Sequence, residues 1–86
     1  MSKIIFTSHA KDKFEMIQKS GFRVTEKDVL ACLKSPDTLE AGPDDIKIAQ
    51  KNFDDKHVLR VVFRRENDKI KIITFHPGNR RRYEEK

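Results

Sequence analysis

The side chains in this sequence that are best suited to chemistry are imidazole, guanidinium and phenol groups rather than paired carboxylates. We expect a catalytic set of His9, Arg60, His76, Arg82 and Tyr83. Positioned histidine and tyrosine side chains transfer protons, and arginine stabilises negative charge that develops in a transition state. Cleavage of RNA needs no metal when a base activates the 2′-OH and an acid protonates the leaving oxygen. The set therefore predicts metal-independent phosphodiester chemistry.

Further basic residues form a second group, which we expect to bind nucleic acid. This group comprises Lys13, Arg64, Lys71, Arg80 and Arg81. The net charge of +5 is uneven, because residues 35–56 are acidic and the rest of the chain is basic. A clustered basic surface favours polyanions, and the planar donors of a guanidinium suit phosphate. The alternative is a solvated surface that keeps a small domain soluble, above all for the run at residues 80–82.

The histidines also have structural interpretations. His9 stands near the start of an expected helix and is either a general base at a rim or a histidine that bonds a neighbouring strand. His76 ends a strand beside Pro77 and is either a site residue or a turn residue. His57 begins the adjacent strand, so we expect it to lie close to His76.

Arg60 lies between Val58 and Val62 on one face of an expected strand. A buried or half-buried arginine is costly unless it is paired or functional. The alternatives are a solvated sheet face and a pair with Glu15 or another acid.

The sequence predicts no metal and no cofactor. Its three histidines lack accompanying cysteines and close ligand spacing. No phosphate-binding loop, serine triad or reactive cysteine pattern is present. The single Cys32 cannot form an internal disulfide, and we expect it to be a small buried apolar residue on a helix.

The candidate residues are positioned by a central hairpin over residues 57–76, with its turn at Asn67 and Asp68. Apolar and polar residues alternate along both arms, which is typical of paired strands, and both faces are apolar at the middle. Strict alternation along the second arm places Ile72 and Phe75 on opposite faces.

The elements before the hairpin are a strand over residues 3–7, two helices and two further strands. Thr7 or Ser8 caps the first helix, and Gly21 follows its end near residue 20. Thr25 begins a capping box for the second helix, and Pro36 ends that helix. The strands follow over residues 37–42 and 46–53. This order predicts an α+β fold, with two N-terminal helices packed on a three- to four-stranded, mainly antiparallel sheet (β-α-α-β-β-β, with one optional further strand).

Length and composition limit the organisation of the chain. Its 86 residues make a single domain over 1–86, with a basic and partly flexible tail over 79–86. There is no apolar run long enough to cross a bilayer and no signal peptide, so we expect a cytoplasmic protein that does not bind membranes.

Short motifs spread over nearly the whole chain resemble the family called domain of unknown function 4258. They are Thr7-Ser8-His9-Ala10, Gly21-Phe22 with Val29 and Leu33, Ser35-Pro36-Asp37, Leu59-Arg60-Val61-Val62, Ile72-Ile73-Thr74-Phe75 and a closing Arg-Arg-Tyr. That family is similar in layout to RelE/ParE-like toxins, many of which are ribonucleases that pair with a small antitoxin. The resemblance implies a RelE-like sheet domain with site residues at Arg60, His76, Arg82 and Tyr83.

Three functional hypotheses follow. The first is a toxin-like ribonuclease or RNA-binding domain of a toxin–antitoxin type system, with RNA or the ribosome as target and a small acidic antitoxin as partner. The second is a non-catalytic module that binds nucleic acid or protein. The third is a homodimer in which the acidic residues 37–55 meet the basic hairpin.

Overall fold

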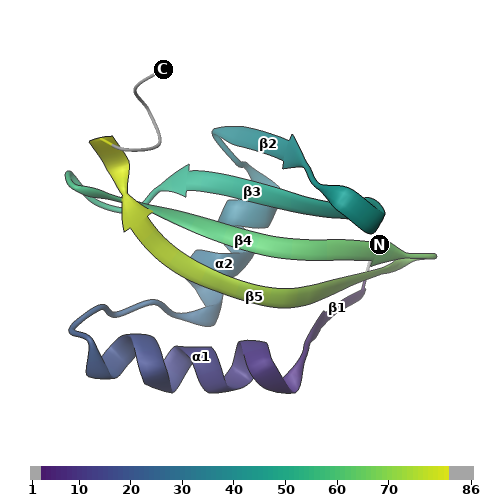
Figure 1. Ribbon diagram of the computed structural model, residues 1–86. Coiled ribbons are helices and arrows are strands. Elements are labelled where there is room, and N and C mark those ends of the chain that lie inside the picture. Colours follow the sequence, from purple (N-terminus) through teal and green to yellow (C-terminus); the bar gives the residue numbers. More distant parts are fainter. Residues whose placement is uncertain (1–2, 82–86) are drawn as a thin grey trace.

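A long hairpin of β4 (His57–Glu66) and β5 (Lys69–Asn79) forms the centre of the molecule, and the computed structural model describes residues 3–81 (Figure 1). The remaining elements are β1 (Lys3–Phe6), α1 (Ser8–Lys19), α2 (Glu26–Lys34), β2 (Thr38–Ala41), the 3-10 turn η1 (Pro43–Asp45) and β3 (Ile46–Asn52). Asn67 turns the hairpin with a φ of 58°. The predicted α+β class and the order of elements are confirmed.

The sheet has five strands in the order β1-β5-β4-β3-β2. Neighbours from β5 to β2 are antiparallel, whereas β1 runs parallel to β5. The expected three to four strands become five because β1 and β2 both join the sheet, one at each edge. The hairpin therefore occupies the middle of the sheet.

The two helices cover one face of the sheet only, with α1 beside β5 and α2 behind β3 and β4 (Figure 1). The fully buried core on this side includes Val29, Cys32, Val61, Ile72 and Phe75. The prediction that Cys32 is a buried residue is confirmed, and burial raises the pKa of its thiol to about 11. No helix within residues 3–81 covers the opposite face of the sheet, which we call the open face.

Thr7 fixes the start of α1 to the sheet. Its hydroxyl accepts a hydrogen bond from the backbone N–H of Ala10 at 3.1 Å, as a helix N-cap does, and donates one to the Ile73 carbonyl at 3.1 Å. Gly21, with a φ of 95°, follows the other end of this helix in the left-handed conformation that glycine adopts without strain. Met16 lies on the outer side of α1 and is 57% exposed.

The capping box of α2 is confirmed. The Thr25 hydroxyl accepts from the backbone N–H of Asp28 at 3.3 Å, and the Asp28 carboxylate accepts from that of Thr25 at 2.9 Å. Val24 and Val29, on either side of this box, are both buried. Leu30 is 37% exposed because α2 meets the sheet along one stripe only.

A β-bulge at Ile73 overturns the strict alternation predicted for β5. Val62 pairs with Thr74 while Phe63 pairs with Ile72, so Ile73 has no partner on β4. The extra residue reverses the faces of the strand from that point on. Ile72 and Phe75 therefore share the core side. The strand also continues through Pro77 to Asn79, beyond the predicted end at His76.

Candidate functional site

The bulge places His76 on the open face, directly across the ladder from Arg60. The two residues are register partners in β4 and β5, so their side chains project from the same side of the sheet. If Ile73 were paired in regular alternation instead of bulged, His76 would point toward the helices. This pair is the starting point of the candidate site, and His76 lies on the part of β5 that follows Ile72, the last residue of β5 paired with β1.

Arg60 is nearly buried, with 8% of its surface exposed, and it is held by two neighbouring strands. Its Nη1 donates to the Gln50 side-chain oxygen on β3, and its Nη2 donates to Glu40 Oε2 on β2 at 3.1 Å. The predicted need for a partner is confirmed. The acid is Glu40 and not Glu15, which instead lies 3.8 Å from the Lys19 amine on α1. The guanidinium is thus fixed in one position.

His76 is half-buried between positive charges. Burial, the Arg60 guanidinium and the Lys13 ammonium, in decreasing order, hold the pKa of His76 below its ordinary value. Each of these effects disfavours the protonated ring. The imidazole is therefore neutral at pH 7 and has one ring nitrogen available to accept a proton.

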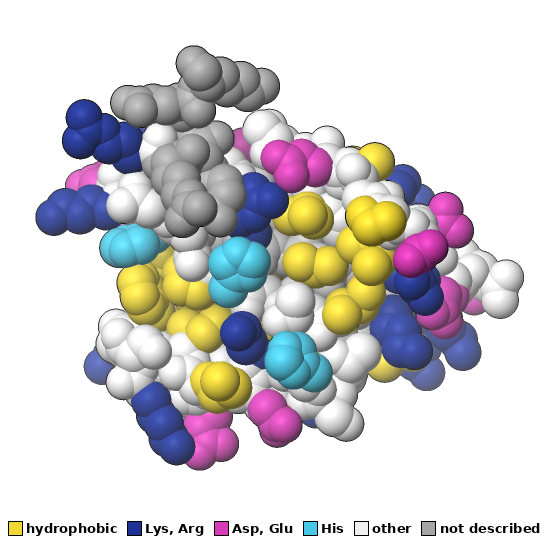
Figure 2. Space-filling view, viewed as in Figure 1, with side chains coloured by type: hydrophobic (Ala, Val, Ile, Leu, Met, Phe, Trp, Pro, Cys, Tyr) yellow, Lys and Arg dark blue, Asp and Glu magenta, His cyan; other side chains and the backbone are white. Residues whose placement is uncertain are grey.

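Helix α1 brings Lys13 and His9 toward the same site. The effect of Lys13 on the pKa of His76 places its ammonium near the imidazole. His9 stands four residues before Lys13, and side chains at this spacing are neighbours on a helix surface, with Cβ atoms roughly 5–6 Å apart. Histidine side chains with a Lys or Arg side chain between them are visible on the open face (Figure 2). We call His9, Lys13, His76 and Arg60 the candidate row.

His57 does not belong to this row, and the expectation that it lies beside His76 is wrong. Its register partner is Asn79, three residues beyond His76. Its ring packs edge-on against Phe22, with centroids 4.7 Å apart, on the helix side of the sheet. Its Nδ1 is 2.9 Å from Asp54 Oδ1. The backbone N–H of Lys56, and then His57, help to lower the pKa of Asp54. His57 is thus a structural residue of the β3–β4 turn.

The other predicted nucleic-acid ligands lie at both ends of the hairpin. Arg64 and Lys71 are cross-strand partners on the open face near the hairpin turn, and the buried Nε of Arg64 has no hydrogen-bond partner in the described chain. Arg80 and Arg81 follow β5, and the Arg80 N–H donates to the Lys56 carbonyl at 2.8 Å. These pairs are separated from each other by the length of the hairpin. Arg82, Tyr83 and the rest of the predicted tail lie outside the described residues 3–81.

Apolar side chains occupy the open face between the candidate row and the basic turn. Ile46, Ile48 and Val62 are partly exposed there, and Figure 2 shows hydrophobic side chains beside the histidines. The face therefore combines cations, a neutral histidine and an apolar area.

Residues 3–81 contain neither a metal-binding cluster of side chains nor a membrane-spanning helix. Among residues 3–81, no three His, Cys, Asp or Glu side chains lie close enough together to hold a metal ion. No helix in that range is long and apolar enough to span a bilayer. The Cys32 thiol lies in the core, with Sγ 3.4 Å from the Ala49 carbonyl oxygen.

Comparisons of this chain with protein-family models, curated proteins and solved structures found no match. The resemblance to domain of unknown function 4258 and to RelE/ParE-like toxins therefore stays a prediction from the sequence motifs.

Proposed function

We propose that this protein binds RNA on the open face of its sheet and cleaves it without a metal ion, with His76 as the general base. The observation that carries the proposal is the half-buried, neutral imidazole of His76 between Arg60 and Lys13. A neutral histidine can take a proton, and adjacent cations attract a phosphodiester. The same three groups thus serve binding and chemistry.

The proposed step is transfer within one RNA strand. His76 accepts the proton of a 2′-OH, and the 2′ oxygen attacks the adjacent phosphorus. The bond from phosphorus to the 5′ oxygen breaks, and that oxygen takes a proton from an acid. His9, one helical turn before Lys13, is the acid among the described residues, and Tyr83 is the other candidate. The products are a 2′,3′-cyclic phosphate and a 5′-hydroxyl.

The two cations have different tasks in this proposal. The Lys13 ammonium has no hydrogen-bond or ion-pair partner within residues 3–81, so it is the group that moves to contact the phosphate. Arg60 is fixed by Glu40 and Gln50, so it acts through its position. A preorganised charge stabilises the negative phosphorane without rearranging during the reaction.

Product analysis tests the proposal directly. End-labelled RNA is incubated with the protein in EDTA, and the fragment ends are identified by mass spectrometry. We expect cyclic phosphate ends with the wild type and with His57→Asn, and a loss of cleavage of about 100-fold or more with His76→Asn. Equal cleavage by both variants, or 3′-hydroxyl products, would rule out this role of His76.

In the cell, we propose that cleavage of RNA makes this protein act as a toxin, and the sequence motifs described above support that role. The cellular target is then RNA or the ribosome, and a small acidic antitoxin neutralises the basic open face. Expression should arrest growth, and His76→Asn should relieve the arrest at equal protein level. Growth arrest that persists in that variant would point to a different target.

A second candidate function is favoured by the apolar part of the open face. Partly exposed Ile46, Ile48 and Val62 suit a protein partner better than a nucleic acid, so the chain would act as a non-catalytic binding module or as a homodimer. Sedimentation equilibrium distinguishes the homodimer from a monomer. RNA that is bound with a strong salt dependence but never cut would favour binding over catalysis.

A further inference from the structure

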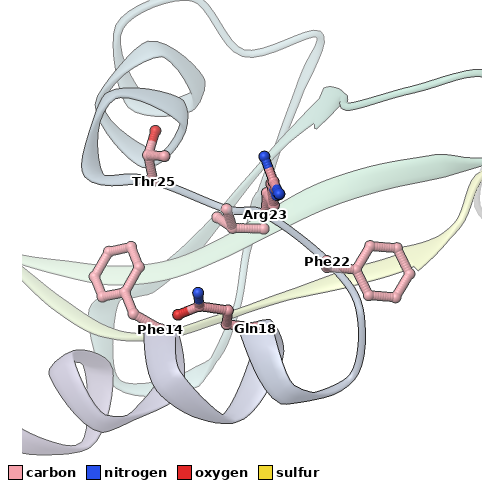
Figure 3. Close-up of a pocket in the computed structure, with 6 residues that line it drawn as sticks. Phe14, Gln18, Phe22, Arg23 and Thr25 are labelled. Atoms are coloured by element: carbon pink, nitrogen blue, oxygen red, sulfur yellow. The ribbon is translucent and has the colours of Figure 1, made fainter.

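A cavity of about 350 Å³ lies at the corner between α1 and α2, on the helix side of the sheet (Figure 3). Its lining residues are Phe14, Gln18, Phe22, Arg23, Val24 and Thr25. Small-molecule sites in proteins start at roughly 300 Å³, so this cavity suits a ligand of modest size. The candidate row does not include any of these residues.

The apolar walls of the cavity are fixed by aromatic contacts with the sheet. The Phe14 ring lies 4.5 Å from that of Phe75, centroid to centroid. The Phe22 ring is held by its edge-on contact with His57, and it points away from the other lining residues (Figure 3). Val24 is buried. A flat apolar ligand therefore meets preformed surfaces, of which the ring of Phe14 is the one suited to stacking.

Two polar side chains at the mouth of the cavity, those of Gln18 and Arg23, are available to bind a ligand. Within residues 3–81, neither the Gln18 amide nor the Arg23 guanidinium has a side-chain hydrogen bond or an ion pair, and both residues are exposed. Gln18 projects from α1 toward the segment that carries Arg23 (Figure 3). A glutamine amide offers one donor and one acceptor side by side, and a guanidinium binds phosphate.

We infer that this cavity binds one unpaired purine nucleotide of the RNA, and that it favours adenine. This inference rests on the proposed function for its ligand class. Aromatic rings stack on bases, and a glutamine amide matches the donor and acceptor of the adenine N6 and N7 edge. Arg23 then contacts the phosphate of that nucleotide.

Helix α1 lies between the cavity and the candidate row and contributes a residue to each. Lys13 approaches His76 on the open face, while Phe14, the next residue, lines the cavity. A single strand that crosses α1 therefore passes from one site to the other. The cavity selects the position of cleavage, whereas the row performs it.

The test is an NMR titration of the ¹⁵N-labelled full chain with AMP, with UMP and inorganic phosphate as comparison ligands. AMP should shift the Gln18 side-chain amide signals, and phosphate alone should leave them unchanged. Gln18→Leu preserves side-chain volume and should weaken AMP binding about tenfold. Identical shifts with AMP and phosphate, or unchanged AMP affinity in Gln18→Leu, would overturn the site. UMP binding as tight as AMP binding would overturn the purine preference.

Separate variants distinguish this inference from the proposed function. His76→Asn should lose RNA cleavage but still bind AMP. Gln18→Leu should keep cleavage and its pH dependence but lose the preference for adenine-containing RNA. Wild-type cleavage without an AMP response at Gln18 refutes the cavity alone. An AMP response at Gln18 with no cleavage of any RNA refutes the catalytic proposal alone.

Discussion

Replacement of Arg60 by methionine should destabilise the fold, because a buried polar group then loses its hydrogen-bond partner. The side-chain oxygen of Gln50 accepts a hydrogen bond from Arg60, and Gln50 is only 6% exposed. A buried polar group that loses its partner costs about 1–3 kcal/mol. The Glu40 carboxylate is 55% exposed and returns to water, so its lost pair adds at most about 1 kcal/mol.

The net cost of Arg60→Met is about 1–2 kcal/mol, because removing a nearly buried charge offsets part of these losses. In a domain of this size, 1 kcal/mol corresponds to a melting temperature change of roughly 4–8 °C. Chemical denaturation followed by far-ultraviolet circular dichroism measures the free energy of unfolding. Glu40→Gln, which leaves the Gln50 contact intact, is the matched control and should cost less than about 1 kcal/mol.

A double variant makes this reasoning refutable. Arg60→Met combined with Gln50→Leu replaces both buried partners by apolar groups, which is often nearly neutral. We expect the double variant to recover most of the stability lost in Arg60→Met. If Gln50→Leu instead lowers the stability of Arg60→Met further, the unpaired Gln50 amide is not the cause of the destabilisation, and this explanation is wrong.

The remaining predictions concern the protonation of His76, the start of α1 and the bulge in β5. Folding lowers the pKa of His76. As the pH falls, the unfolded chain therefore binds a proton at His76 before the folded chain does. The contribution of His76 to stability is therefore fully present above about pH 6.5, is lost as the pH falls through the folded-state pKa and is constant below it. In His76→Asn, the slope of the unfolding free energy against pH should be smaller in this range. Thr7→Val removes both hydroxyl hydrogen bonds at the start of α1 and should cost about 1–2 kcal/mol, measured by thermal melting. Deletion of Ile73 removes the extra residue and leaves Ile72 and Phe75 on the core side by regular alternation, so His76 should stay opposite Arg60; a large change in the ¹³C shift of the imidazole in that variant would contradict the assignment of Ile73 as the bulged residue.

Local signals in the sequence were sufficient to predict the helices and their ends. Thr25 and Asp28 form the capping box that their spacing indicates, and Gly21 adopts the left-handed conformation expected after a helix. These features depend on hydrogen bonds over a few residues, so the chain determines them without reference to the rest of the fold. The paired arms of the hairpin were predictable for the same reason.

Features that depend on the whole sheet could not be read from the sequence. The bulge at Ile73 has no glycine or other local signal, and it decides which face carries His76. The partners of Arg60, Glu40 and Gln50, lie on two other strands, so they become visible only when the strand register is known. The cavity at the α1–α2 corner likewise requires the relative placement of two helices.

The most direct test of the central claim is the pH dependence of single-turnover RNA cleavage in EDTA. If His76 is the base, the rate falls at acid pH through a pKa below the ordinary value of histidine. Lys13→Met removes a neighbouring cation and should move this limb to higher pH, whereas Lys11→Met, an exposed lysine on the same helix, should not. An acid limb that stays in place in Lys13→Met, or cleavage that requires a divalent metal, would contradict the account.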